Sequence, residues 1–172
     1  MGRRRPVRGF VVNTVTLPLG FDVPEGWTPV EPEEPGPVFV AVRPEPGAEF
    51  TANLTLGVRQ RPDPASLEDI ADEAVKRLAS ATAAVDVLDR RAVGAPPAPG
   101  LTQTLRLRTG EGLELRQVQV HLTVPGPDGG VVLELVLTAS AEAAARLVPD
   151  FRRFVASVHL RRKTLAGEGE QP

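Results

Sequence analysis

Few side chains in this sequence could form a catalytic centre. The chain has no cysteine, and its only histidines are His121 and His159. The lack of cysteine excludes a thiol nucleophile, a cysteine zinc site and an iron–sulfur cluster. No serine lies in the Gly-x-Ser-x-Gly turn of a serine hydrolase. The remaining enzyme hypothesis is an acid–base pair of His121 and Glu134, which requires an enclosed pocket that contains both side chains.

Acidic and glycine-rich segments offer no stronger chemistry. Glu33 and Glu34 lie in a proline-rich stretch, and the acidic residues of segment 68–73 lie on the polar face of a predicted helix. Acid–base catalysis needs carboxylates that are desolvated to different degrees, so we interpret both groups as solvated surface. Segments 110–112 and 126–130 lack the features of a phosphate-binding loop and are typical of hairpin turns. We therefore expect no enzyme activity, no metal and no cofactor.

The pattern most relevant to function is a polar sheet face. Gln117, Gln119 and His121 alternate with apolar residues, so they project to one side of a strand. Neighbouring strands are expected to add further polar residues to this face. It either faces water, as one face of an antiparallel sheet often does, or forms the floor of a partner-binding site. In the second case the binding residues would be Arg106, Arg108, Gln117, Gln119, His121 and Glu134, with Thr104 and Thr138 beside them.

Trp27 is the single tryptophan of the chain. It follows Phe21 closely and is predicted either to cover the core beside Phe21 or to be an exposed anchor for a partner. We include Trp27 among the candidate binding residues.

Alternating and helical periodicities predict the elements that position these residues. Alternation predicts seven strands, at about 10–17, 38–43, 50–59, 85–93, 101–109, 113–124 and 131–139. Helices are predicted after Ser66 and Ser140, which are suitable N-caps, and Pro149 should kink or divide the second helix. The proline-rich stretch 28–37 is predicted to be an irregular loop. The order βββαββββα indicates an α+β fold, a seven-stranded antiparallel sheet packed with two main helices.

Charge and length suggest one domain with basic ends. The formal net charge is −2, and arginines cluster within the first eight residues and again after residue 160. We predict a flexible basic N-terminus (1–8), a single domain (9–160) and a disordered tail (161–172). No aromatic residues interleave the arginines, so no nucleic-acid partner is expected. No signal peptide or membrane span is apparent, which favours the cytoplasm. Arginine far outnumbers lysine, which suggests a GC-rich bacterial genome.

Two short signatures resemble a known superfamily. The corner Leu19-Gly20-Phe21-Asp22-Val23-Pro24-Glu25-Gly26-Trp27 and the closing segment Phe151-Arg152-Arg153-Phe154-Val155-Ala156-Ser157 are similar to those of the PsbP-like superfamily, including DcrB-like and LpqN/LpqT-like bacterial proteins. A helix that begins Ser66-Leu67-Glu68 also fits, and the resemblance covers residues 10–160. It implies helices packed on both sides of an antiparallel sheet and no enzyme. It also implies adaptor, accessory or chaperone roles.

The first functional hypothesis is therefore a cytoplasmic protein-binding module, an adaptor or a secretion-type chaperone. Its partner would be another protein, such as a secreted effector, or a second copy of the chain in a homodimer. The alternative is a carrier of a small molecule or lipid, with a cavity between the sheet and the helices.

Overall fold

The computed structural model describes residues 9–13, 18–33, 36–61, 65–95, 98–126 and 129–161. Most of the two predicted flexible ends, 1–8 and 161–172, lies outside these residues. The helices are α1 (Leu67–Ala81) and α2 (Ala141–Ser157). The strands are β1 (Gly9–Asn13), β2 (Pro18–Asp22), β3 (Thr28–Val30), β4 (Pro37–Arg43), β5 (Ala52–Arg61), β6 (Ala84–Ala95), β7 (Ala98–Arg108), β8 (Glu114–Gly126), β9 (Gly129–Ser140) and β10 (His159–Leu160).

These strands form two antiparallel sheets. The main sheet has seven strands in the order β3-β4-β5-β9-β8-β7-β6, and the small sheet has the order β1-β2-β10. Strands β6 to β9 form a meander, because each pairs with the next along the chain. β5 joins the meander through β9, with Asn53 opposite Thr138. The predicted α+β class, with a seven-stranded antiparallel sheet and two main helices, is confirmed.

The N-terminal strands differ from the prediction. Residues 10–13 of the predicted strand 10–17 lie in β1, which pairs with β2 so that Phe10 is opposite Phe21, and residues 14–17 lie outside the described residues. The predicted loop 28–37 includes the edge strand β3. Pro29 is tolerated there because the outer side of an edge strand does not need the N–H that proline lacks. His159 lies in β10 opposite Gly20, shortly after α2 ends at Ser157.

The middle strands are longer than predicted. β6 and β7 extend past the predicted strand ends at 93 and 101, with Gly94 directly opposite Pro99, and residues 96–97 lie outside the described residues. The predicted turn at 110–112 is confirmed, because Gly112 N–H donates to the Thr109 carbonyl at 3.0 Å.

Both helices begin at the predicted serine caps. The Ser66 hydroxyl accepts from Asp69 N–H at 3.1 Å, and the Asp69 carboxylate accepts from Ser66 N–H at 3.3 Å, which is a capping box. The Ser140 hydroxyl accepts from Ala143 N–H at 3.2 Å. α2 continues past Pro149 to Ser157 as one helix, so of the two predicted effects of Pro149, a kink or a division, the division is wrong. Pro149 is exposed, so its ring meets little packed structure.

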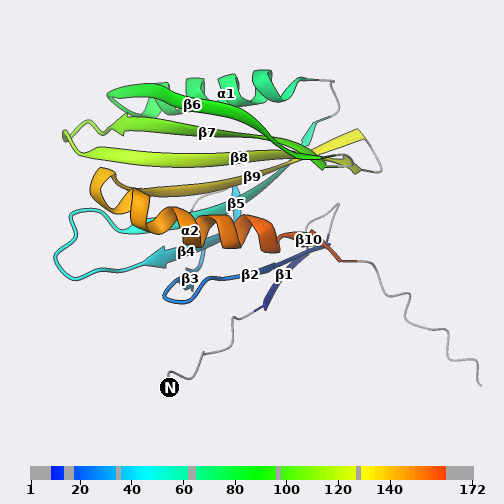
Figure 1. Cartoon of the computed structure of the whole chain (residues 1–172), viewed down its shortest axis with the longest axis horizontal. Coiled ribbons are helices and arrows are strands. Elements are labelled where there is room, and N and C mark those ends of the chain that lie inside the picture. The colour runs from blue at the N-terminus through cyan, green and yellow to red at the C-terminus, as the bar shows by residue number, and fades with distance from the viewer. Residues whose placement is uncertain are drawn as a thin grey trace, which may run out of the picture.

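The two helices cover opposite faces of the main sheet (Figure 1). α1 contacts β6, β7 and β8, whereas α2 contacts β8, β9 and also β2 of the small sheet. Side chains alternate between the two faces along β8, so Gln119 points toward α1 and Val120 toward α2. The layers are therefore α1, the main sheet, and then α2 with the small sheet.

The main core lies on the α2 face, where the two signature segments meet. Phe21 of β2 packs edge-to-face on Phe154 of α2, with ring centroids 5.7 Å apart. The Ser157 hydroxyl accepts from Asp22 N–H at 2.9 Å. Each segment thus contributes apolar and polar contacts to the other, which explains why both carry recognisable sequence patterns.

Candidate binding groove

The predicted polar face exists, but α1 covers it. Gln117, Gln119, His121, Glu134 and Thr138 do lie on one face of β8 and β9, as predicted. That face is packed against α1, so it neither lies open to water nor forms an exposed floor for a partner. The expectation of an uncovered polar face is therefore wrong, because the sequence pattern shows which residues share a face but not which face the helix covers.

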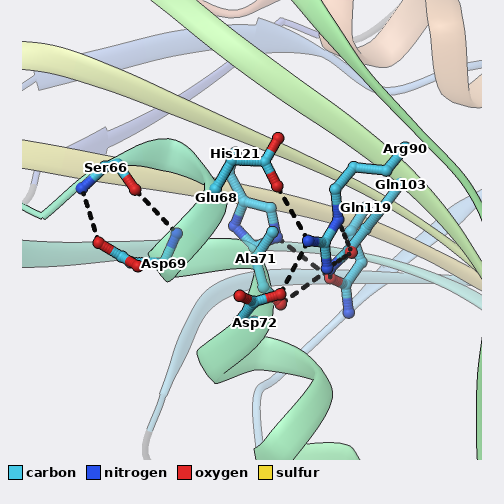
Figure 2. Close-up of polar contacts among 9 residues, drawn as sticks. All are labelled: Ser66, Glu68, Asp69, Ala71, Asp72, Arg90, Gln103, Gln119 and His121. Carbon is cyan, nitrogen blue, oxygen red and sulfur yellow. Dashed lines mark hydrogen bonds and ion pairs between the residues drawn. The ribbon is translucent and has the colours of Figure 1, made fainter.

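A chain of amides runs through this buried layer, and Figure 2 shows its part from Ala71 through Gln103 to Gln119. Gln103 of β7 donates to the Ala71 carbonyl of α1 at 3.2 Å and to the Gln119 side-chain oxygen at 2.7 Å. Gln119 donates to Gln117 at 2.6 Å, and Gln117 donates to the Thr138 hydroxyl at 3.0 Å. Buried amides are costly unless they are hydrogen-bonded, so we interpret this chain as structural, fixing α1 on the sheet.

Arg90 links the same layer to α1 from the edge strand (Figure 2). Its guanidinium donates to the Gln103 side-chain oxygen at 2.9 Å, to Asp72 at 2.8 Å and to Glu68 at 3.0 Å. These two helix carboxylates, interpreted from the sequence as solvated, therefore hold the helix to β6. Segment 68–73 has a further attachment, because Glu73 binds Arg61 at 2.6 Å.

His121 and Glu134 are close together, but the hollow of about 230 Å³ that Glu134 lines does not include His121. His121 is 0% exposed, and its Nδ1 lies 3.7 Å from Glu134 Oε2, which is too long for a hydrogen bond. Gln119 Oε1 accepts from Gln103, so His121 Nε2 must be the donor to that oxygen at 3.1 Å, which leaves Nδ1 without its proton. Burial lowers the His121 pKa, and the nearby Glu134 only partly opposes this.

The predicted arginines lie apart from this layer. Arg106 is directly opposite Arg116 in the β7–β8 ladder, and Leu105 is opposite Gln117, so Arg106 and Arg108 project toward the α2 face. Thr104 does so as well. Arg106 binds Asp86 at 3.1 Å, and Arg108 lies 3.5 Å from Glu114. The prediction that Arg106 and Arg108 share one face with the three buried residues of β8 is therefore wrong. The register places the two arginines one residue out of phase with them.

Trp27 lies in the core. It is 6% exposed, and its indole N–H donates to Asp150 Oδ2 of α2 at 2.9 Å. This matches the interpretation of Trp27 as a cover for the core and not as an exposed anchor. Arg43 lies 3.5 Å from the same carboxylate oxygen, so the corner at Trp27 is tied to α2 by a charged pair as well.

The strongest candidate site is a groove that the sequence interpretation did not identify by residue. It lies between α2 and the adjoining face of β6, β7 and β8, has a volume of about 640 Å³, and is called the α2 groove below. Its lining residues are Asp89, Arg91, Val93, Gly94, Thr102, Thr104, Arg116, Val118, Val120, Leu122, Ala141, Ala144, Ala145, Val148, Phe151, Arg152, Val155 and Ala156. Most are apolar, and small alanines on α2 leave the space open.

A single cation interrupts the apolar β8 wall of the groove. Arg116 is in phase with Val118, Val120 and Leu122, and its NH1 atom is buried without a hydrogen-bond partner among the described residues. The sequence signal was available, because an arginine in an otherwise apolar alternation is unusual.

A second hollow of about 670 Å³ lies beside the start of α2 and is lined by the 45–50 turn. The Arg146 at its edge is already paired with Glu45 at 2.7 Å. Within the described ranges, no group of three metal-ligating side chains comes together. No described helix combines the length and apolar character that crossing a membrane requires.

Comparison with known proteins gives structural matches only. No protein-family profile and no curated protein sequence matches the chain. The crystal structure of LpqN, involved in cell envelope biogenesis of Mycobacterium tuberculosis, superimposes with a TM-score of 0.70 at 12% identity, over 92% of this chain and 93% of that one. The solution structure of PsbP (CyanoP) from Synechocystis gives 0.59 at 15% identity, over 83% and 86%.

A third match comes from yeast. The Ran-binding protein Mog1p of Saccharomyces cerevisiae superimposes with a TM-score of 0.57 at 13% identity, covering 90% of this chain and 96% of that one. At such low identities the likeness concerns the fold and not the function. The chain therefore has the PsbP-like fold, shared with LpqN and Mog1p, that the two signature segments implied.

Proposed function

We propose that this chain is a non-catalytic binding protein that carries an apolar small molecule in the α2 groove. The observation that supports this most directly is the groove itself. Its volume of about 640 Å³ is within the range of ligand sites, about 300–1,000 Å³. Its walls come from a helix and three strands of the main sheet, so they are held apart by rigid elements.

The non-catalytic part of the proposal is supported by the chemistry of the lining. The groove contains neither histidine nor serine, and its one carboxylate, Asp89, lies 4.0 Å from Arg91 at the exposed edge strand. His121, the best general base in the sequence, is sealed under α1 on the opposite face.

The test has two parts. Native mass spectrometry of protein purified from its host should show a bound species of low mass. Ala145 is exposed and lines the groove, so Ala145→Trp should fill the space without disturbing the core and should remove that species. A clean apo mass from the host, together with no binding of any apolar probe added to the pure protein, would contradict the proposal.

A second candidate, the adaptor or chaperone role, is supported by edge strand β6. Among the described residues β6 pairs only with β7, so its outer edge is free, and Val87 and Leu88 on it are 46% and 47% exposed. A free strand edge can accept a strand from another protein. Mog1p is described as Ran-binding, so this fold is compatible with protein partners.

This candidate has its own experiment. A tagged chain and its Leu88→Arg variant are recovered from the host in parallel. One specific protein bound to the first and lost from the second supports the adaptor role, whereas identical recoveries contradict it. Light scattering of the pure chain at rising concentration tests whether the partner is a second copy. The cytoplasmic location stays a prediction.

A further inference from the structure

We infer that the molecule carried in the α2 groove is an anionic amphiphile, with a linear apolar chain and a head group that Arg116 binds. The head would be a carboxylate, sulfate or phosphate, all of which accept hydrogen bonds from guanidinium. This inference rests on the proposed function and adds the chemical class of the ligand. It is carried by the burial of Arg116, the charge of the groove and the direction of its apolar wall.

Arg116 is the unusual residue of the site. Its side chain lines the groove, and its NH1 atom is buried without a hydrogen-bond partner in the described part of the chain. Removing a charged N–H group from water is costly when no acceptor replaces the water. A bound anion would supply that acceptor, and the planar guanidinium can bind two oxygens of one head group.

The arginines around Arg116 are already engaged. Arg106, directly across the β7–β8 ladder, binds Asp86 at 3.1 Å, and Arg108 lies 3.5 Å from Glu114. Arg91 of the groove lies 4.0 Å from Asp89. No acidic residue is paired with Arg116 among the described residues, and unlike Arg152, the exposed third arginine of the groove, Arg116 has a buried NH1 atom that a ligand could satisfy.

The charge of the groove also differs from that of the molecule. Three arginines and one aspartate line it, which gives the groove a formal charge of +2, while the whole chain carries −2. A cationic groove on an acidic protein favours an anion over a cation. The apolar walls then select an anion that also carries a hydrocarbon chain.

The position of Arg116 sets the orientation of the ligand. From Arg116 the wall continues along β8 through Val118, Val120 and Leu122, and these six residue steps span about 20 Å at the rise of a strand. Val148 and Val155 face this wall from α2. The head would therefore lie at the Arg116 end, and the hydrocarbon chain would extend toward Leu122.

The Arg116 end is also where α2 begins. Arg116 is opposite Ala139 in the β8–β9 ladder, next to the helix cap Ser140, and Ala141 lines the groove. The positive end of the helix dipole therefore adds to the charge of Arg116, although Glu142 in the first turn reduces it. Both effects act at the end where the head group is placed.

The experiment compares head groups on one hydrocarbon chain by isothermal titration calorimetry. The probes are decanoate, decan-1-ol and decyltrimethylammonium, with decyl sulfate and decyl phosphate added to rank the anionic heads. The wild type should bind decanoate at least about tenfold more tightly than decan-1-ol, and the cation most weakly, because a hydrogen-bonded charge is worth about that factor or more.

Variants then assign the preference to one residue. Arg116→Gln should weaken decanoate binding by about 10- to 100-fold and leave decan-1-ol binding unchanged. Arg116→Lys keeps the charge and should retain part of the preference, and it serves if the glutamine variant fails to fold. Arg106→Gln is the matched control, since it removes the same charge at the opposite ladder position from an arginine that is already paired.

The outcomes separate this inference from the proposed function. Equal affinity for decanoate and decan-1-ol, with both lost in Ala145→Trp, would overturn the anionic head and leave the carrier function standing. A preference for decanoate that survives in Arg116→Gln would overturn the role of Arg116. If no probe binds the wild type, the carrier function fails, and the inference fails with it.

Discussion

His121 is a buried histidine that burial keeps in its neutral form. Its pKa is lowered by desolvation first, is raised in part by Glu134, and is lowered further by Arg77, Arg59 and Arg90. The histidine of the unfolded chain has a pKa of about 6.5, so below this pH the unfolded state binds a proton that the folded state does not. Stability from this group is therefore complete above about pH 6.5 and is lost as the pH falls toward the lowered pKa.

This difference in pKa between the folded and unfolded states makes the free energy of unfolding depend measurably on pH. The free energy of unfolding in urea should fall between about pH 7.5 and about pH 5.5, by at most about 1.4 kcal/mol per pH unit below 6.5. His121→Gln keeps a polar side chain beside Gln119 and should flatten the profile. Greater stability of the wild type at the acidic end would mean that Glu134 outweighs burial.

Gly26 occupies a backbone conformation that favours glycine. Its φ is +88°, and a Cβ there would collide with Arg43 NH1, which lies 3.3 Å from the Glu25 carbonyl. Gly47 also has a positive φ, +75°, but its Cβ would meet nothing within 4 Å. We expect Gly47→Ala to cost about 1 kcal/mol of backbone strain and Gly26→Ala clearly more, because Arg43 must also move. Thermal unfolding of both variants checks the order, and equal losses would contradict it.

At this scale the sequence predicted the caps and the polar phase of β8 correctly. Ser66, Ser140 and the alternation of Gln117, Gln119 and His121 follow from local rules, because capping and alternation depend on neighbours in the chain. The sequence did not predict that Arg106 lies across from Arg116. That fact depends on the register between two strands, which a turn of a different length would have changed.

Helix α2 contains a proline that the fold tolerates. Pro149 lacks an N–H, so the helix loses one hydrogen bond at that turn, yet it continues to Ser157. Because Pro149 is exposed, Pro149→Ala should restore the bond without removing core contacts and should stabilise the protein by about 1–3 kcal/mol.

Pro46 provides the comparison. It lies exposed in the 43–50 turn, where proline stabilises by restricting the unfolded chain, so Pro46→Ala should be slightly destabilising. Chemical denaturation of both variants measures whether each substitution raises or lowers the free energy of unfolding. A loss of stability in Pro149→Ala would show that the helix needs the proline for its path over the sheet.

At the scale of elements, the sequence predicted the meander and both helices. It failed where pairing partners are distant or where a strand is short. The short strands β1 and β3 are defined by pairing with β2 and β4, not by any periodicity of their own. The covering of the polar face by α1 has the same origin, since it is a tertiary choice between two faces of one sheet.

For the whole molecule, the class and layer order were predictable, and the groove was not. The class followed from the order of elements and the two signature segments, which meet through Phe21 and Phe154. The groove exists because alanines of α2 lie opposite valines of β8, and neither set differs from ordinary core residues in the sequence. Only Arg116, a charged residue in an otherwise apolar alternation, could have indicated the groove.

The pairing of β5 with β9 also determines when the sheet can be completed during synthesis. Asn53 of β5 can pair with Thr138 of β9 only after Thr138 has left the ribosome. The β4–β5 hairpin therefore emerges long before β9 exists. A truncated chain that ends at residue 126 would leave two strand edges bare, and it should aggregate without a cooperative unfolding transition. Sedimentation and circular dichroism of that fragment test this expectation. A fragment that melts cooperatively would contradict it and would show that the β4–β5 hairpin packs against another part of the fragment. A nascent chain of this protein is thus most vulnerable just before β9 is made.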